Sequence, residues 1–226
     1  MKEQISEIQN LNDICRRNRY GIYKQWIYKK EDYMKMCDYM QKINYSIQDL
    51  NSTIEDLKEF NGKNVVYIIS LVDWIREAFN AIINVINPII IKDFHFSKQA
   101  DFKKHTNYFK AIRSFIVAHP LKTDQHEQYG FDGNYICVDI RDNVDLFPLP
   151  DRSNEYSVSI SGLRNKMLGN EDFYLFCYSD KDDNMKYFKK IGCRYADIFD
   201  TARLYIDKLY ELDKYLVKNI KRKDYE

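Results

Sequence analysis

An arginine and a histidine near the middle of the chain could together carry out acid–base chemistry on a phosphate. Arg113 and His119 lie in the segment Phe109-Lys-Ala-Ile-Arg-Ser-Phe-Ile-Val-Ala-His-Pro120. A guanidinium binds phosphate through a planar fork of N–H donors. Imidazole titrates close to neutral pH and therefore serves as both general acid and general base. The pair indicates a site that acts on a phosphodiester.

The element that must position Arg113 is a predicted helix over residues 97–118, with Ser97 as its N-cap and Pro120 as its stop. On a wheel of about 100° per residue, Arg113 falls near the middle of the apolar face. An unpaired buried charge costs several kcal/mol in order of magnitude, so an arginine there is a functional candidate. The alternative is that it snorkels to solvent or pairs with a core carboxylate. The apolar face consists of Phe102, Phe109, Ile112, Ile116 and Val117.

His119 closes the predicted helix, where the partial negative charge of a helix C-terminus favours an imidazolium. It stands six positions after Arg113, which puts the two side chains about 120° apart around a regular helix and about 9 Å apart along it. A shared site therefore requires the chain to unwind at His119, or a second copy of the helix end from a dimer. The alternative role for a lone histidine at this position is helix capping.

Two neighbouring residues are candidates for supporting roles, Ser114 directly after the arginine and His105 two turns before it. His105 is also interpretable as a core or interface histidine. Metal donors such as Asp93 and His95 lack a recognisable ligand spacing, so we predict neither a metal nor another cofactor.

A basic stretch near the N-terminus interleaves cations with aromatic residues, as surfaces that bind single-stranded nucleic acid do. Its candidate RNA-binding residues are Arg16, Arg17, Arg19 and Lys24. The alternative is a solvated basic face of an amphipathic helix. Because the net charge is only +1, RNA binding requires a local patch or a second subunit.

The remaining pattern predicts a mainly α fold with a small antiparallel β insertion. Apolar residues recur every three or four positions over 29–60, 64–86 and 195–221, and Asn87-Pro88 ends the second of these helices. Turn-forming residues alternate with β-rich runs between 129 and 191, where 173–178 and 185–191 should form a hairpin. We expect one domain, 1–226, with residues 129–191 inserted between the motif helix and the C-terminal helix.

Composition limits the class of protein. Hydrophobic residues make up 45% and charged residues 31% of the chain, a balance that excludes disorder. No segment resembles a secretory signal or a membrane span. The five cysteines are scattered and never form a C-x-x-C pair, which favours reduced thiols. We expect a cytoplasmic protein without membrane partners.

The segment 109–120 resembles the Arg-x(4–6)-His signature of HEPN domains, with five residues between Arg113 and His119. The resemblance implies a helical bundle that dimerises and cleaves RNA without metal, with toxin–antitoxin or phage-defence roles and an antitoxin or regulatory protein as a further partner. The family usually places Asn, Asp or His directly after the arginine, where this chain has Ser114. The alternative is a non-catalytic helical scaffold that binds RNA, a nucleotide or a protein.

Overall fold

The computed structural model describes residues 5–18, 27, 29–118, 129, 135–142, 155–165, 170–179 and 189–219. The chain divides into two compact units. Unit 1 comprises Met1–Ser6, Thr53–Ser70 and Lys103–Thr201, and unit 2 comprises Glu7–Ser52, Leu71–Phe102 and Ala202–Glu226. The fold is mainly α with a small sheet between helices along the chain, as the sequence predicts. That the whole chain forms a single domain stays a prediction.

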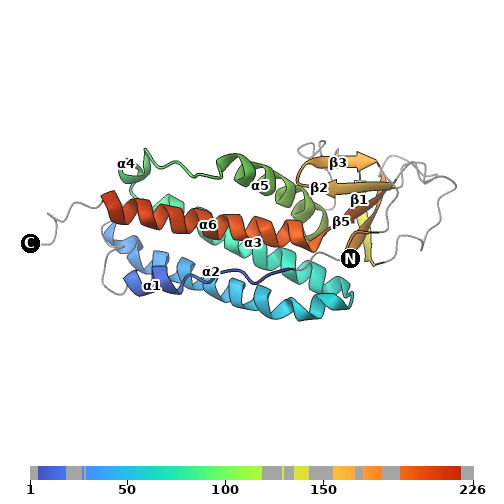
Figure 1. Ribbon diagram of the computed structural model, residues 1–226, viewed down its shortest axis with the longest axis horizontal. Helices are drawn as coiled ribbons and strands as arrows, with labels where there is room; N and C mark the ends of the chain where they lie inside the picture. The colour runs from blue at the N-terminus through green and yellow to red at the C-terminus, as the bar shows by residue number, and fades with distance from the viewer. Residues whose placement is uncertain are drawn as a thin grey trace, which may run out of the picture. The chain divides into compact units, whose positions relative to one another are not determined.

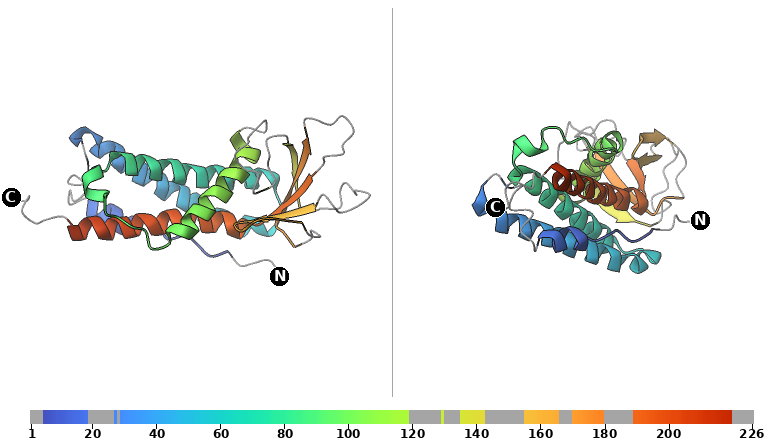
Figure 2. Two further views of the ribbon diagram at one scale, coloured as in Figure 1. Left: turned by 90° about the horizontal axis from the view of Figure 1, so that it is seen from above. Right: turned by 60° about the vertical axis from the view of Figure 1, so that its left-hand side comes forward.

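Unit 2 is helical. It contains α1 (Asn12–Asn18), η2 (Lys30–Asp32), nearly all of α2 (Tyr33–Thr53), the C-terminal part of α3 (Gly62–Val85), α4 (Pro88–Ile91) and the C-terminal part of α6 (Tyr195–Asn219). The long helices lie alongside one another (Figures 1 and 2). Met40 of α2, Ile82 of α3 and Leu212 of α6 line one small apolar cavity. The apolar stripes read from the sequence therefore converge in this core.

The ends of two helices in unit 2 are fixed by side chains. Asn87 caps α4, because its side-chain oxygen accepts a hydrogen bond of 3.0 Å from the backbone of Ile89 and Pro88 occupies the first helical position. The break at Asn87-Pro88 is thus confirmed. The next helix, α5 (Gln99–Arg113), begins two residues after Ser97. Ser97 is therefore not adjacent to the first helical residue, as an N-cap would be. Its hydroxyl and its backbone N–H instead donate hydrogen bonds to the carboxylate of Glu211.

Unit 1 contains a five-stranded sheet of order β1-β4-β5-β2-β3. β4 and β5 pair antiparallel, which confirms the predicted hairpin, but β2 and β5 pair parallel, so the sheet is mixed and not antiparallel throughout. Residues 155–165 form two strands, β2 and β3, joined by a tight turn, and Gly162 takes a φ of 109° that favours glycine. The strands are β1 (Tyr135–Arg141), β2 (Glu155–Ser159), β3 (Gly162–Asn165), β4 (Phe173–Ser179) and β5 (Lys189–Cys193).

Helices cover the sheet within unit 1. The end of α5 lies next to the strands (Figures 1 and 2), and Phe109 and Ile112 on it are fully buried, as are Phe173 and Leu175 of β4. The carboxylate of Asp172 accepts a 2.8 Å hydrogen bond from the first backbone N–H of α6 and so fixes that helix at the sheet. Unit 1 also holds η3 (Glu55–Lys58), the start of α3 and η4 (Ser114–Ala118). No helix among the described residues is long and apolar enough to cross a membrane.

Candidate phosphodiester site at the end of helix α5

Arg113 is the last residue of α5, and the helix changes its geometry directly after it. Ser114–Ala118 form a π-helical turn, η4. Single π turns within helices are rare and frequently mark functional sites. Arg113 and Ser114 are both half-buried and each has an interaction partner. The fully buried residues Tyr108, Ala111 and Ile112 lie on a face of the helix that is centred more than about 100° from Arg113, so the arginine lies at the edge of the buried face and not in its middle.

The predicted apolar face does not continue to the end of the helix. Val117, which a regular helix would place on that face, is 42% exposed, while Phe115 is buried. A π turn contains more residues per turn than an α-helical turn, so the residues after it are rotated relative to a regular helix. The unwinding at His119 that a shared site within one chain would require lies outside the described residues.

His119 lies outside the described residues, and so does Pro120. The convergence of the Arg113 and His119 side chains stays a prediction. Two of the predicted RNA-binding residues, Arg19 and Lys24, also lie outside the described residues.

The π turn forms one wall of an open groove of about 370 Å³ within unit 1. Phe115 and Ile116 contribute an apolar surface, Lys63 of α3 an exposed ammonium, and Asp139 of β1 a carboxylate. Asp139 also accepts a 2.6 Å hydrogen bond from Arg141. An apolar wall beside a cation can hold a flat ring and an attached anionic group. Sequence reasoning missed this groove, because its walls come from segments far apart in the chain. Its other lining residues are Gly62, Val66, Cys137 and Ile140.

His105 is connected to the packing of α5 against α6. Its Nδ1 lies 3.4 Å from the hydroxyl of Thr201, which is buried and donates a 2.9 Å hydrogen bond to the backbone oxygen of Asp197. His105 precedes Arg113 by eight residues, about 12 Å along a regular helix. This contact favours the core alternative over a supporting role in the site.

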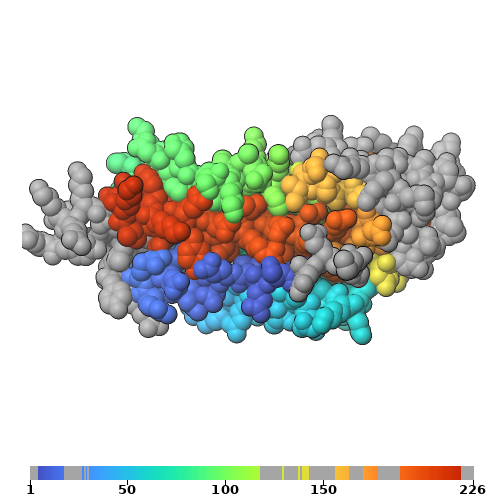
Figure 3. Space-filling model, in the orientation of Figure 1, coloured from blue at the N-terminus to red at the C-terminus, as the bar shows by residue number. Residues whose placement is uncertain are grey.

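The two described arginines of the N-terminal basic stretch differ. Arg16 is exposed, whereas Arg17 forms an ion pair with Asp213, whose side chain is only 3% exposed. Arg17 and Asp213 line an open cavity of about 580 Å³ in unit 2, where residues near α1 lie against the C-terminal part of α6 (Figure 3). Asp213 was detectable from sequence, since it follows Leu209 by four residues and precedes Leu216 by three on the apolar stripe. Besides these two residues, the cavity is lined by Gln9, Asp13, Lys98, Asp207, Tyr210, Glu211, Lys214 and Val217.

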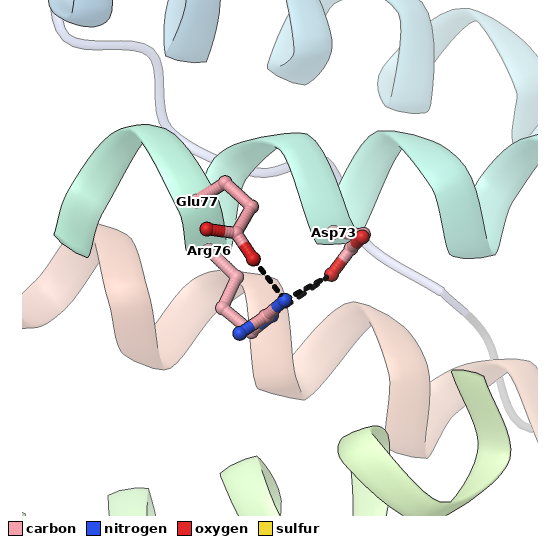
Figure 4. A network of polar contacts seen from close by, with 3 residues as sticks. All are labelled: Asp73, Arg76 and Glu77. Carbon is pink, nitrogen blue, oxygen red and sulfur yellow. Dashed lines mark hydrogen bonds and ion pairs between the residues drawn. The ribbon is translucent and has the colours of Figure 1, made fainter. Parts of the chain in front are cut away.

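Another arginine, Arg76 in α3, is buried more completely than Arg113. It is 9% exposed and forms ion pairs with Asp73 and Glu77 (Figure 4). It stands four residues after Val72 and three before Phe79 on the apolar stripe, the same signal that singled out Arg113. Here the side chain is tied into a polar network and has a structural role.

No protein-family model, curated protein or solved structure matches the chain. Within the described ranges, no three His, Cys, Asp or Glu side chains gather in an arrangement that could hold a metal ion. The prediction that the site needs neither metal nor another cofactor stays a prediction.

Proposed function

We propose that the chain is a metal-independent endoribonuclease of HEPN type whose site is formed by Arg113 and His119. The supporting observation is the change from α to π geometry directly after Arg113, at a turn that forms a wall of an open groove. A half-buried arginine at such a turn can be oriented by the fold while its guanidinium still reaches a ligand. Ser114, next to it, would help to orient it.

The chemistry follows from what RNA supplies. The 2′-hydroxyl is the nucleophile, so the protein must remove its proton, stabilise the charge on the phosphorane and protonate the leaving 5′-oxygen. In a homodimer, His119 of one subunit acts as the base and His119 of the other as the acid. Arg113 binds the phosphate oxygens through its guanidinium fork. The products are a 2′,3′-cyclic phosphate and a 5′-hydroxyl.

Substrate binding would use the groove of unit 1. A base can pack on Phe115 and Ile116 while the ammonium of Lys63 attracts a phosphate. On unit 2, exposed Arg16 is a further phosphate contact, whereas the charge of Arg17 is compensated by Asp213. An antitoxin or another regulatory protein, and a role in growth arrest or phage defence, belong to the same proposal.

A second candidate is a non-catalytic binding protein of the same architecture. The observation that favours it is the largely apolar lining of the groove, where Val66 is 38% exposed beside Phe115 and Ile116. Such a groove can bind an RNA base, a nucleotide or an apolar side chain of a protein without any reaction. This candidate predicts RNA or nucleotide binding that does not depend on His119.

The test is cleavage of a labelled single-stranded RNA in EDTA by the full chain and its variants. His119→Ala should slow cleavage by about 10²- to 10⁴-fold, the usual contribution of general acid–base catalysis. Arg113→Ala should cause a loss of similar size that Arg113→Lys does not restore, because lysine lacks the planar fork. His95→Ala and Arg194→Ala, which change exposed side chains, are the matched controls.

Two outcomes would contradict the nuclease. One is cleavage that persists unchanged in His119→Ala, which would assign the activity to other residues or to a contaminant. The other is RNA binding without any cleavage by the wild-type chain, which would support the binding protein instead. Product ends distinguish the mechanism further, since a 3′-hydroxyl product would exclude attack by the 2′-hydroxyl.

A further inference from the structure

Two cysteines face each other across the pairing of β1 and β4. Cys137 and Cys177 are direct partners in the antiparallel register. Opposite residues of such a pair have Cα atoms about 4.5–5.5 Å apart and project from the same face of the sheet. Disulfides span Cα separations of about 4.4–6.8 Å. The backbone therefore already holds the two thiols at a separation that a disulfide can bridge.

The two thiols differ in access. Cys137 is half-buried and lines the groove beside the π turn, while Cys177 is fully buried. The register shifts between Cys137 and Asp139, and the Cys137 thiol donates to the backbone oxygen of Asp139 at 3.6 Å. Such bulges re-aim side chains and are enriched next to functional sites. A small reagent in the groove would thus meet Cys137 first, with Cys177 behind it.

The two thiols also differ in ionisation. A side-chain hydrogen bond with Cys177 lowers the pKa of the Cys137 thiol, and burial raises the pKa of the Cys177 thiol well above its ordinary value. A lowered pKa increases the fraction of thiolate, which is the nucleophilic form. Cys137 is therefore suited to attack an oxidant, and Cys177 to remain a protonated thiol until Cys137 has been oxidised.

We propose that Cys137 and Cys177 form a redox site that hydrogen peroxide converts reversibly into a disulfide. The Cys137 thiolate attacks one peroxide oxygen, the O–O bond breaks, and Cys137 becomes a sulfenic acid as water leaves. The sulfur of Cys177 then attacks the sulfenic sulfur, and its proton departs with the hydroxyl as a second water. Two thiols and one peroxide thus give one disulfide and two waters, and a dithiol reductant restores the thiols.

Formation of the disulfide changes the wall of the groove in unit 1. Cys137 belongs to the groove wall, so the disulfide fixes that wall to β4 and withdraws the thiol from the groove. Among the other cysteines, Cys193 is fully buried, and Cys15 and Cys37 are half-buried outside the sheet. Cys15 and Cys37 thus provide an internal comparison of similar exposure without a thiol opposite them in a strand pair.

The test is peptide mapping of the reduced full chain after a stoichiometric dose of hydrogen peroxide. We expect an intact chain lighter by two hydrogens, one linked peptide pair joining Cys137 to Cys177, and full reversal by dithiothreitol. Cys15 and Cys37 should remain alkylatable. A linked pair that involves other cysteines, or no linked pair while Cys15 or Cys37 oxidises, would overturn the proposal.

Variants separate the two roles. Cys177→Ser, which keeps a hydrogen-bond donor beside Cys137, should leave Cys137 as a sulfenic acid that dimedone traps, with complete loss of the linked peptide. Cys137→Ser should abolish both the dimedone adduct and the link, and Cys15→Ser should change neither. A dimedone adduct on Cys177 in the wild-type chain would reverse the assignment. The peptide map of the wild-type chain requires no variant and no RNA. Its result therefore does not depend on whether a variant folds or on whether the proposed ribonuclease function is correct.

Discussion

Replacing Asp73 with alanine should lower the free energy of unfolding by about 3 kcal/mol, because it leaves the guanidinium of Arg76 in the core without its main partner. Nε of Arg76 donates to Asp73 at 2.8 Å, and a terminal nitrogen lies 2.8 Å from the same carboxylate oxygen. Both side chains are largely buried, at 11% and 13% exposure. Breaking a buried pair by removing one partner costs about 3–5 kcal/mol.

The neighbouring carboxylate of Glu77 reduces this cost only slightly. Glu77 also pairs with Arg76, but its side chain is 59% exposed, and an exposed pair contributes about 0–1 kcal/mol. Glu77→Ala should therefore change stability by less than about 1 kcal/mol. Arg76→Met leaves the carboxylate of Asp73, which is only 13% exposed, without the guanidinium, so it should also be destabilising, by an amount similar to Asp73→Ala.

The assay is urea unfolding of the three single variants and of the double variant Asp73→Ala/Arg76→Met. With a slope of about 3 kcal/mol per molar urea, Asp73→Ala should lower the midpoint by about 1 M. The double variant should be more stable than either Asp73→Ala or Arg76→Met alone, because it leaves neither charge of the pair uncompensated. If Asp73→Ala costs less than about 1 kcal/mol, or no more than Glu77→Ala, the network does not neutralise a core charge and the reasoning fails.

Two further predictions concern ionisation. Burial raises the pKa of the Cys177 and Cys193 thiols well above 9.0. At high pH the folded chain therefore keeps two protons that the unfolded chain releases. The contribution of these thiols to the free energy of unfolding should be constant below pH 9.0 and should fall as the pH rises above it, by up to about 1.4 kcal/mol per pH unit for each thiol. Urea midpoints between pH 8 and 10.5 measure this slope, and Cys193→Ala should flatten it; an unchanged slope would contradict the assignment. The Lys208 ammonium, 4.1 Å from the centre of the Phe102 ring, should titrate below 10.5 because burial lowers its pKa. A value at or above 10.5 by NMR would mean that the cation–π contact outweighs the loss of hydration.

The long helices could be predicted from sequence because their faces depend on local spacing. Residues three and four apart share a helix face whatever the rest of the chain does, and Met36, Met40 and Ile43 of α2 are buried as this rule requires. Strand pairing has no such local rule. Nothing in the spacing of residues reveals that Tyr156 of β2 pairs parallel with Ile191 of β5, more than thirty residues later. The short helix α4 was missed because it has only four residues.

The site could be predicted only in its residue types and not in its surroundings. The helical wheel placed Arg113 near the middle of the apolar face, whereas the side chain is half-buried at the last residue of α5. The same wheel, applied to α3, identifies Arg76, where it reports a buried structural network. A cation on an apolar stripe is therefore a signal for a partner or a ligand, and the sequence does not say which.

Charge favours a dimeric RNA site over a monomeric one. The chain has a net charge of +1, and Arg17 and Arg76 are paired with carboxylates inside the fold, so the charges of these two arginines are already compensated. Each phosphate contact steepens the dependence of single-strand affinity on salt, by about 0.7 in log–log slope. A twofold-related copy doubles the contacts made by Arg113 and Lys63 without changing the charge of the chain. RNA binding should therefore strengthen over the concentration range in which dimers form, and its salt slope should about double there.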